Sequence, residues 1–127
     1  MLGAHSDSST DADTLFGGPS MRLAVYGSLA PGRSNHHMLA HLRGTWHPVT
    51  AHGILKDQGW AAGTGFPAFT WDPAGPPVAM QVFESPDLPA HWPTLDEFEG
   101  EDYPRMLIPV IRGGGVEVAN VYAAAIP

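Results

Sequence analysis

Five of the thirteen acidic residues in this chain fall within seven positions, from Asp96 to Asp102. In a helix successive residues turn by roughly 100°, so residues three and four apart share a face. If the segment ending at Glu99 is helical, Glu99 continues an apolar stripe, Glu97 points to the opposite side, and Asp96 lies at the edge of the stripe. The stripe consists of Leu88, Trp92 and Leu95.

The pattern therefore turns a single acid, Glu99, toward the interior, while Glu101 and Asp102 follow the helix-stopping Gly100 and are expected in solvent. Three effects would raise the pKa of an inward carboxylate here: desolvation, neighbouring acids and the negative end of the helix dipole. Such a Glu is suited to taking up and returning a proton near neutral pH. The alternative is that Glu99 caps the helix or pairs with Arg105.

A glycine-containing turn, VYGSLAPG, directly follows a short apolar run and precedes a helical stretch. Successive backbone N–H groups in such a turn can bind an anion, and Gly27 would let a ligand approach the backbone closely. No phosphate-loop pattern is present, so a small carboxylate is the better candidate ligand. The alternative is an ordinary strand-to-helix turn.

His37 and His41 have the spacing of a helical zinc pair, but Met38 occupies the position where a zinc-protease motif requires Glu. The pair also lies away from the stripe that contains Leu39. We therefore expect a polar helix face and no metal site.

Composition places the chain among single soluble domains: 127 residues, 43% of them hydrophobic and 15% charged. A net charge of −7 with no basic run argues against nucleic-acid and anionic-membrane partners. The absence of cysteine excludes disulfides, thiolate metal sites and a Cys nucleophile. No apolar stretch could span a bilayer and no signal peptide is recognisable, so a cytoplasmic protein is expected.

Fifteen glycines and thirteen prolines favour short strands and many turns. Residues 1–20 are expected to form a mobile tail and residues 21–127 a single domain. Strands are predicted at 22–26, 45–55, 78–83, 106–111 and 116–125, with a short one at 66–71. A helix following Ser34 and ending near Gly44, and a second from Asp87 to Glu99, complete a small α+β sheet or barrel.

Two segments together carry a resemblance to a known family. AVYGSLAPGRSNHHML resembles the opening signature of the gamma-glutamylcyclotransferase-like superfamily, V-Y-G-[ST]-L-x-x-G-x-x-N. LDEFEGEDYPR resembles its second signature, L-D-x-F-E-G-x-x-Y-x-R, and GFPAF and VAMQVF are similar to segments between the two. The resemblance covers roughly residues 22–125 and implies a mixed β-barrel of five to six strands flanked by helices.

The resemblance also implies site residues and a reaction. Tyr26, Gly27, Ser28 and Leu29 would bind the substrate carboxylate, and Glu99 would be the catalytic acid/base. A γ-glutamyl amide would cyclise through attack of its α-amine on its own γ-carbonyl, releasing 5-oxoproline and a free amine. Backbone N–H groups near Ser28 and Leu29 are candidates to stabilise the oxyanion, and no metal or organic cofactor is required.

Other positions leave alternatives open. Tyr103 either hydrogen-bonds the substrate or packs, and Arg105 is expected to pair with a carboxylate of the acidic cluster. Met80 stands where the family usually has glycine, and the details of Gly59–Pro77 do not align, so the substrate stays undefined. A non-catalytic module that binds a small carboxylate is the second function class, although an inward acid favours an enzyme. An interaction protein has little support.

Overall fold

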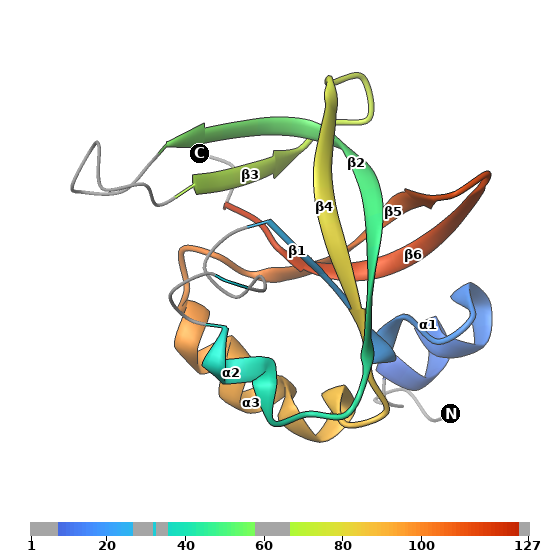
Figure 1. Cartoon of the computed structure of the whole chain (residues 1–127), viewed down its shortest axis with the longest axis vertical. Coiled ribbons are helices and arrows are strands. Elements are labelled where there is room, and N and C mark those ends of the chain that lie inside the picture. Colours follow the sequence, from blue (N-terminus) through green and yellow to red (C-terminus); the bar gives the residue numbers. More distant parts are fainter. Residues whose placement is uncertain (1–7, 27–31, 33–35, 58–66, 125–127) are drawn as a thin grey trace.

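The computed structural model describes residues 8–26, 32, 36–57 and 67–124 (Figure 1). The described chain forms six strands and three α-helices with one short 3-10 helix. The strands are β1 (Arg22–Val25), β2 (Thr45–Asp57), β3 (Pro67–Trp71), β4 (Pro77–Glu84), β5 (Arg105–Arg112) and β6 (Gly115–Tyr122). The helices are α1 (Ser8–Phe16), η1 (Pro19–Met21), α2 (His37–Ala40) and α3 (Leu88–Glu99).

Five strands close into a barrel in the order β2-β4-β1-β6-β5, and a pairing between Thr50 of β2 and Ile111 of β5 completes the ring. β1 and β6 run parallel, whereas the other neighbours are antiparallel. β3 is an extra strand that pairs only with β2 among the described strands. This confirms the predicted α+β class and the small mixed barrel.

Glycine allows β2 and β3 to lie close together. A Cβ added to Gly53 would lie 2.4 Å from the carbonyl oxygen of Thr70 and 2.5 Å from the ring of Phe69. Only a residue without a side chain fits such an approach. The long strand β2 thus holds β3, and with it Phe69, against the barrel.

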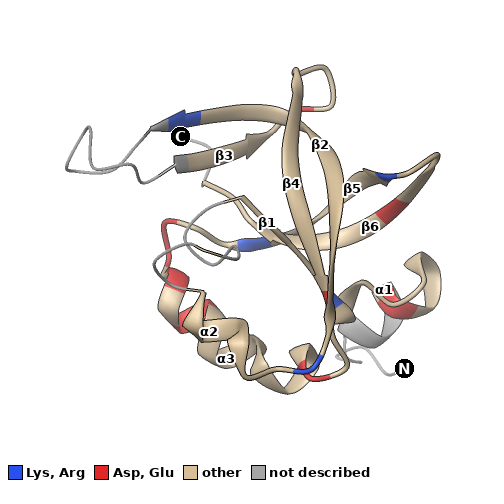
Figure 2. Ribbon diagram, viewed as in Figure 1, with Lys and Arg blue, Asp and Glu red and all other residues tan. Residues whose placement is uncertain are grey.

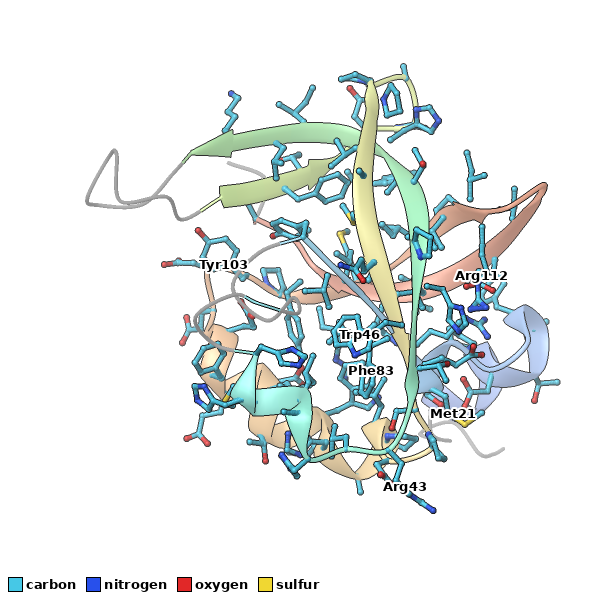
Figure 3. All side chains as sticks on the ribbon, viewed as in Figure 1. Met21, Arg43, Trp46, Phe83, Tyr103 and Arg112 are labelled. Carbon is cyan, nitrogen blue, oxygen red and sulfur yellow. The ribbon has the colours of Figure 1, made fainter. Side chains whose placement is uncertain are left out.

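Two apolar clusters hold the fold together. One fills the barrel with side chains from β1, β2, β4, β5 and β6 and includes Met80 and Phe69. The other lies between the barrel and the helices α2 and α3, where Trp46 stacks on Phe83 with ring centroids 4.8 Å apart (Figure 3). The predicted stripe of α3 belongs to this second cluster, since its three large apolar residues are buried.

The bounds of α3 agree with the sequence prediction. The helix ends at Glu99, and Gly100 has a φ of 78°, a left-handed conformation that glycine adopts at little cost. At the other end Asp87 holds the N-cap position, but its side chain makes no capping hydrogen bond. It instead accepts hydrogen bonds from Arg43.

The first predicted helix is shorter than expected. α2 covers only His37–Ala40, and Leu42 donates a hydrogen bond to the carbonyl of Leu39 as the chain turns away. Ser34, the predicted cap, lies outside the described residues. After α2 the chain instead places Arg43 against Asp87 and enters β2 at Thr45, so tertiary contacts accompany the early end of the helix.

The N-terminal region differs from the expected tail. Residues 8–21 form α1 and η1, and the side chain of Arg22 donates hydrogen bonds to the carbonyls of Phe16, Gly17 and Val118. Asp13 accepts hydrogen bonds from the backbone and hydroxyl of Ser20. These contacts attach residues 13–20 to the β1–β6 side of the barrel, a long-range effect that a local polar composition does not reveal.

Within the described residues, no helix combines the length and the apolar character needed to cross a membrane.

Candidate active site

The end of α3 gathers the acidic cluster, visible as red ribbon beside α2 (Figure 2). Glu97, Glu101 and Asp102 are exposed, whereas Asp96 and Glu99 are partly buried. The distribution follows the helical spacing: Glu99 lies four residues after buried Leu95, and Glu97 lies on another face. Glu99 is therefore the acid of this cluster most affected by desolvation.

Burial raises the pKa of the Glu99 carboxyl to about 7, from an ordinary value of 4.5. Among the described residues, its carboxylate has no hydrogen-bond or ion-pair partner. The alternative that Glu99 pairs with Arg105 is thus not what the structure shows. A carboxyl group with this pKa exists in both protonation states at neutral pH.

Arg105 pairs with Asp96, which confirms the prediction that it binds a carboxylate of the cluster. Its Nε lies 2.9 Å from Oδ1 of Asp96 and its Nη2 lies 3.3 Å from Oδ2. Nη1 donates to the side-chain oxygen of Asn120 at 3.0 Å, and the guanidinium carbon lies 4.3 Å from the centre of the Trp92 ring. Three residues from two elements, α3 and β6, thus fix the orientation of this cation.

Asp96 receives a further hydrogen bond, because the Tyr122 hydroxyl donates to its Oδ1 at 2.6 Å. Desolvation opposes ionisation of Asp96, but the hydrogen bonds from Arg105 and Tyr122 outweigh it and hold the pKa of the carboxyl below its ordinary value. Asp96 and Glu99, three residues apart on one helix, therefore have opposite pKa shifts.

Tyr26, which directly follows β1, lies within electrostatic range of Glu99. Burial raises the pKa of its phenol, and the nearby charges of Glu99 and Tyr103 add to the effect. The hydroxyl donates to the carbonyl of Tyr122 at 2.6 Å and accepts from the backbone N–H of Phe69 at 3.3 Å. Glu99 therefore lies near the last described residue before the glycine turn. Gly27, Ser28 and Leu29 lie outside the described residues.

Tyr103 lies beyond Gly100, at the opposite end of α3 from Arg43 (Figure 3). Its half-buried ring packs against the cluster between barrel and helices. It also borders an open depression of about 460 Å³. The residues that line the depression are Asp96, Glu97, Gly100, Glu101, Tyr103, Pro104, Arg105 and Tyr122. Glu99 is not among them, so we define the candidate site by Glu99 and Tyr26 and treat this depression as its neighbour.

Two further sequence features have clear positions. Met80 is buried in the barrel cluster against which the Tyr26 ring packs. His37 and His41 are exposed, and the His41 ring contacts His91 edge-on with centroids 5.2 Å apart. Within the described part of the chain, no three His, Asp or Glu side chains are grouped so as to hold a metal ion.

Comparison with known families identifies the fold. Residues 23–126 match the family model described as "Gamma-glutamyl cyclotransferase, AIG2-like". The chain belongs to this family. The match spans β1, with Tyr26 at its end, α3 with Glu99, and the rest of the barrel. A comparison with curated protein sequences gives no match.

Solved structures of family-like proteins have the same fold. An AIG2-like protein from Mus musculus superposes with a TM-score of 0.65 at 21% identity, covering 83% of this chain and 77% of the mouse protein. YkqA from Bacillus subtilis gives a TM-score of 0.64 at 24% identity, covering 84% of this chain. This chain spans only 36% of YkqA. A Kluyveromyces lactis allophanate hydrolase variant shares the fold at 17% identity and a TM-score of 0.59.

The side chains around Arg105 were only partly found by sequence reasoning. The position of Asp96 at the edge of the stripe and the nearby Arg105 pointed to an ion pair. Tyr122 and Asn120 carry no local signal, because they reach Asp96 and Arg105 through pairing of β5 with β6. In that ladder Arg105 lies opposite Tyr122 and Leu107 lies opposite Asn120.

Proposed function

We propose that this protein is a γ-glutamyl cyclotransferase that releases 5-oxoproline and a free amine from a γ-glutamyl amide. Family membership supports this class of chemistry, and one observation carries the assignment to a residue. The carboxyl group of Glu99 is half-buried beside Tyr26, lacks a counter-ion among the described residues and has a pKa raised to about 7.

Glu99 acts as both base and acid in the proposed reaction. The carboxylate removes a proton from the substrate α-ammonium group, and the freed amine attacks the γ-carbonyl carbon of the same molecule. A new C–N bond closes the five-membered ring, the attacking nitrogen loses its second proton to solvent as it becomes the ring amide, and the original amide C–N bond breaks. The protonated Glu99 returns the proton to the departing nitrogen, so the enzyme ends in its starting state. This reaction draws on no cofactor.

The raised pKa suits both steps. A carboxylate with an ordinary pKa is too weak a base to deprotonate an ammonium group effectively, whereas a base with a pKa near the working pH loses less driving force. An acid with the same pKa is also still able to protonate a leaving amine. Burial of the carboxyl group, with no counter-ion among the described residues, is what raises this pKa.

Substrate orientation is proposed to come from the segment after β1. The backbone of Gly27, Ser28 and Leu29 would hold the α-carboxylate so that the amine faces the γ-carbonyl, which reduces the entropic cost of ring closure. The hydroxyl of Tyr26 is already bonded to Tyr122 and Phe69, so its contribution would be to shape the site. Tyr103 is proposed to contact the departing amine.

The decisive experiment measures 5-oxoproline release from a panel of γ-glutamyl compounds. The panel contains dipeptides, ε-lysine conjugates, polyamine conjugates and glutathione. Wild type should release 5-oxoproline from at least one compound, and Glu99→Gln should lose about 10²–10⁴-fold in kcat/KM. Glu97→Gln, which changes an exposed acid in the same helix turn, is the matched control and should retain activity.

The outcomes separate the two function classes. Full activity in the Glu99→Gln variant would remove the proposed role of this residue. Calorimetric binding of a panel compound without any 5-oxoproline would favour a non-catalytic binding module. In that case Gly27→Val tests the binding loop, because a side chain at this position should block the ligand; unchanged affinity would contradict the loop assignment.

A further inference from the structure

The two partly buried acids of α3 differ in their counter-ions, because Asp96 pairs with Arg105 and Glu99 has no such partner among the described residues. Asp96 and Glu99 are three residues apart, so they lie on neighbouring positions of one helix face. Arg105 forms a two-point contact with Asp96 and none with Glu99. The phenol of Tyr122 is within electrostatic range of all three groups, because the charges of Asp96, Arg105 and Glu99 all influence its pKa.

We propose that Asp96 is a positioning residue for Glu99: it holds the guanidinium group of Arg105 and so leaves the Glu99 carboxylate without a counter-charge. The inference rests on the proposed function of Glu99 as acid/base and extends it to the residues that preserve its reactivity.

Geometry explains why Arg105 stays with Asp96. The guanidinium group also bonds to Asn120 and stacks on Trp92, and these contacts match the orientation required by Asp96. The Tyr122 hydroxyl occupies a further lone pair of Asp96 at 2.6 Å. The carboxylate of Asp96 is thus held by three donors from β5 and β6.

Loss of the negative charge at position 96 should redirect Arg105. An Asp96→Asn variant keeps the shape of the side chain but removes its charge, which leaves Glu99 as the remaining partly buried carboxylate of α3. An opposite charge within about 4–6 Å typically lowers a carboxyl pKa by about 1–3. The phenols of Tyr26 and Tyr122 are the described titratable groups whose pKa values the charge of Glu99 influences.

The test is a carbon-13 NMR titration of the Glu99 carboxyl in the full chain. We expect a pKa near 7 in wild type, a decrease of at least about 1 in Asp96→Asn, and a return toward the wild-type value in Asp96→Asn/Arg105→Gln. Glu97→Gln is the matched control for loss of one negative charge from the same helix and should change the titration little. The pKa on the acid side of the pH profile of kcat/KM should shift by the same amount as the Glu99 pKa measured by NMR.

Two results would overturn the proposal: an unchanged Glu99 pKa in Asp96→Asn, or a low value that persists in the double variant. If Asp96→Asn does not fold, the single variant Arg105→Gln decides. A rise in the Glu99 pKa of more than about 1 would show that Arg105 already pairs with Glu99 in solution, and a smaller change would support the role of Asp96. Absence of 5-oxoproline release with these shifts intact would reject the enzymatic function alone.

Discussion

The two ends of α3 carry the same kind of ion pair in different surroundings. At the start, Arg43 bonds both oxygens of Asp87 at 2.8 and 3.2 Å, and at the end Arg105 bonds both oxygens of Asp96 at 2.9 and 3.3 Å. The side chain of Arg43 is 78% exposed, against 25% for Arg105. Hydrogen-bond geometry is nearly identical, and the carboxylate of Asp87 is less exposed than that of Asp96, at 28% against 43%. The exposure of the arginine and its additional contacts therefore make the difference.

The comparison shows that an ion pair must be judged by what surrounds it. At the exposed start, water and salt compete with the pair, even though the hydrogen bonds from Arg43 lower the pKa of Asp87 to about 2. At the other end Arg105 also contacts Asn120 and Trp92, and a second acid lies one turn away. The first pair links a turn to a helix, whereas the second controls which acid of the site has a counter-ion.

Removal of Arg105 should have the largest effect on stability. Arg105→Gln leaves Asp96 with a single side-chain donor and deprives the side-chain oxygen of buried Asn120 of its donor. We therefore expect a loss of about 2 kcal/mol in the free energy of unfolding, measured with urea at pH 7. The pKa of Asp96 is lowered, so the stability from this pair is present above the ordinary Asp pKa and is lost as the pH falls below it. The difference between variant and wild type should therefore shrink in acid. A constant difference down to pH 3 would contradict this account.

Glu99→Gln should change stability in the opposite direction. The folded-state pKa of Glu99 is raised, so folding favours the protonated form, and the ionised form becomes a cost as the pH rises through about 7. Glutamine resembles the protonated acid. At pH 8 the variant should be more stable than wild type by about 1–2 kcal/mol, after allowance for partial solvent contact, and at pH 4 the two should agree. A variant less stable than wild type at pH 8 would show that the ionised carboxylate has a stabilising partner.

Changes at the exposed pair should have the smallest effect. Arg43→Gln and Asp87→Asn are each expected to shift the urea midpoint by less than Arg105→Gln does. Their shifts should vanish in 1 M salt. A large, salt-resistant shift would mean that exposure does not separate the two ends of the helix.

Much of the fold could be predicted because short stretches of sequence mark where its strands and helices end. Glycine and proline bound the strands, and the apolar spacing of Leu88, Trp92 and Leu95 defined α3 as far as Gly100. The same spacing selected Glu99 as the acid that turns away from solvent. Local rules were sufficient there because one helix face determines which of its residues are buried.

The contacts that distinguish Asp96 from Glu99 could not be predicted in the same way. Tyr122 lies 26 residues from Asp96 in sequence, and it reaches that carboxylate only because β6 pairs with β5. The bond from Tyr26 to the carbonyl of Tyr122 spans 96 residues. Likewise, the carbonyls of Pro19 and Ser20 in η1 accept hydrogen bonds from Asn120 and Trp92, which are distant along the chain. Such contacts depend on barrel closure and not on local spacing.

The attachment of η1 has a practical consequence for preparing the protein. Asn120 donates to the carbonyl of Pro19 and Trp92 donates to that of Ser20, and these same two side chains contact Arg105. A recombinant chain that starts at Met21 would keep every strand but lose both acceptors. The choice of first codon can therefore change the contacts of Asn120 and Trp92, which hold Arg105 near the proposed catalytic site. An inactive shortened protein would not by itself contradict the proposed reaction.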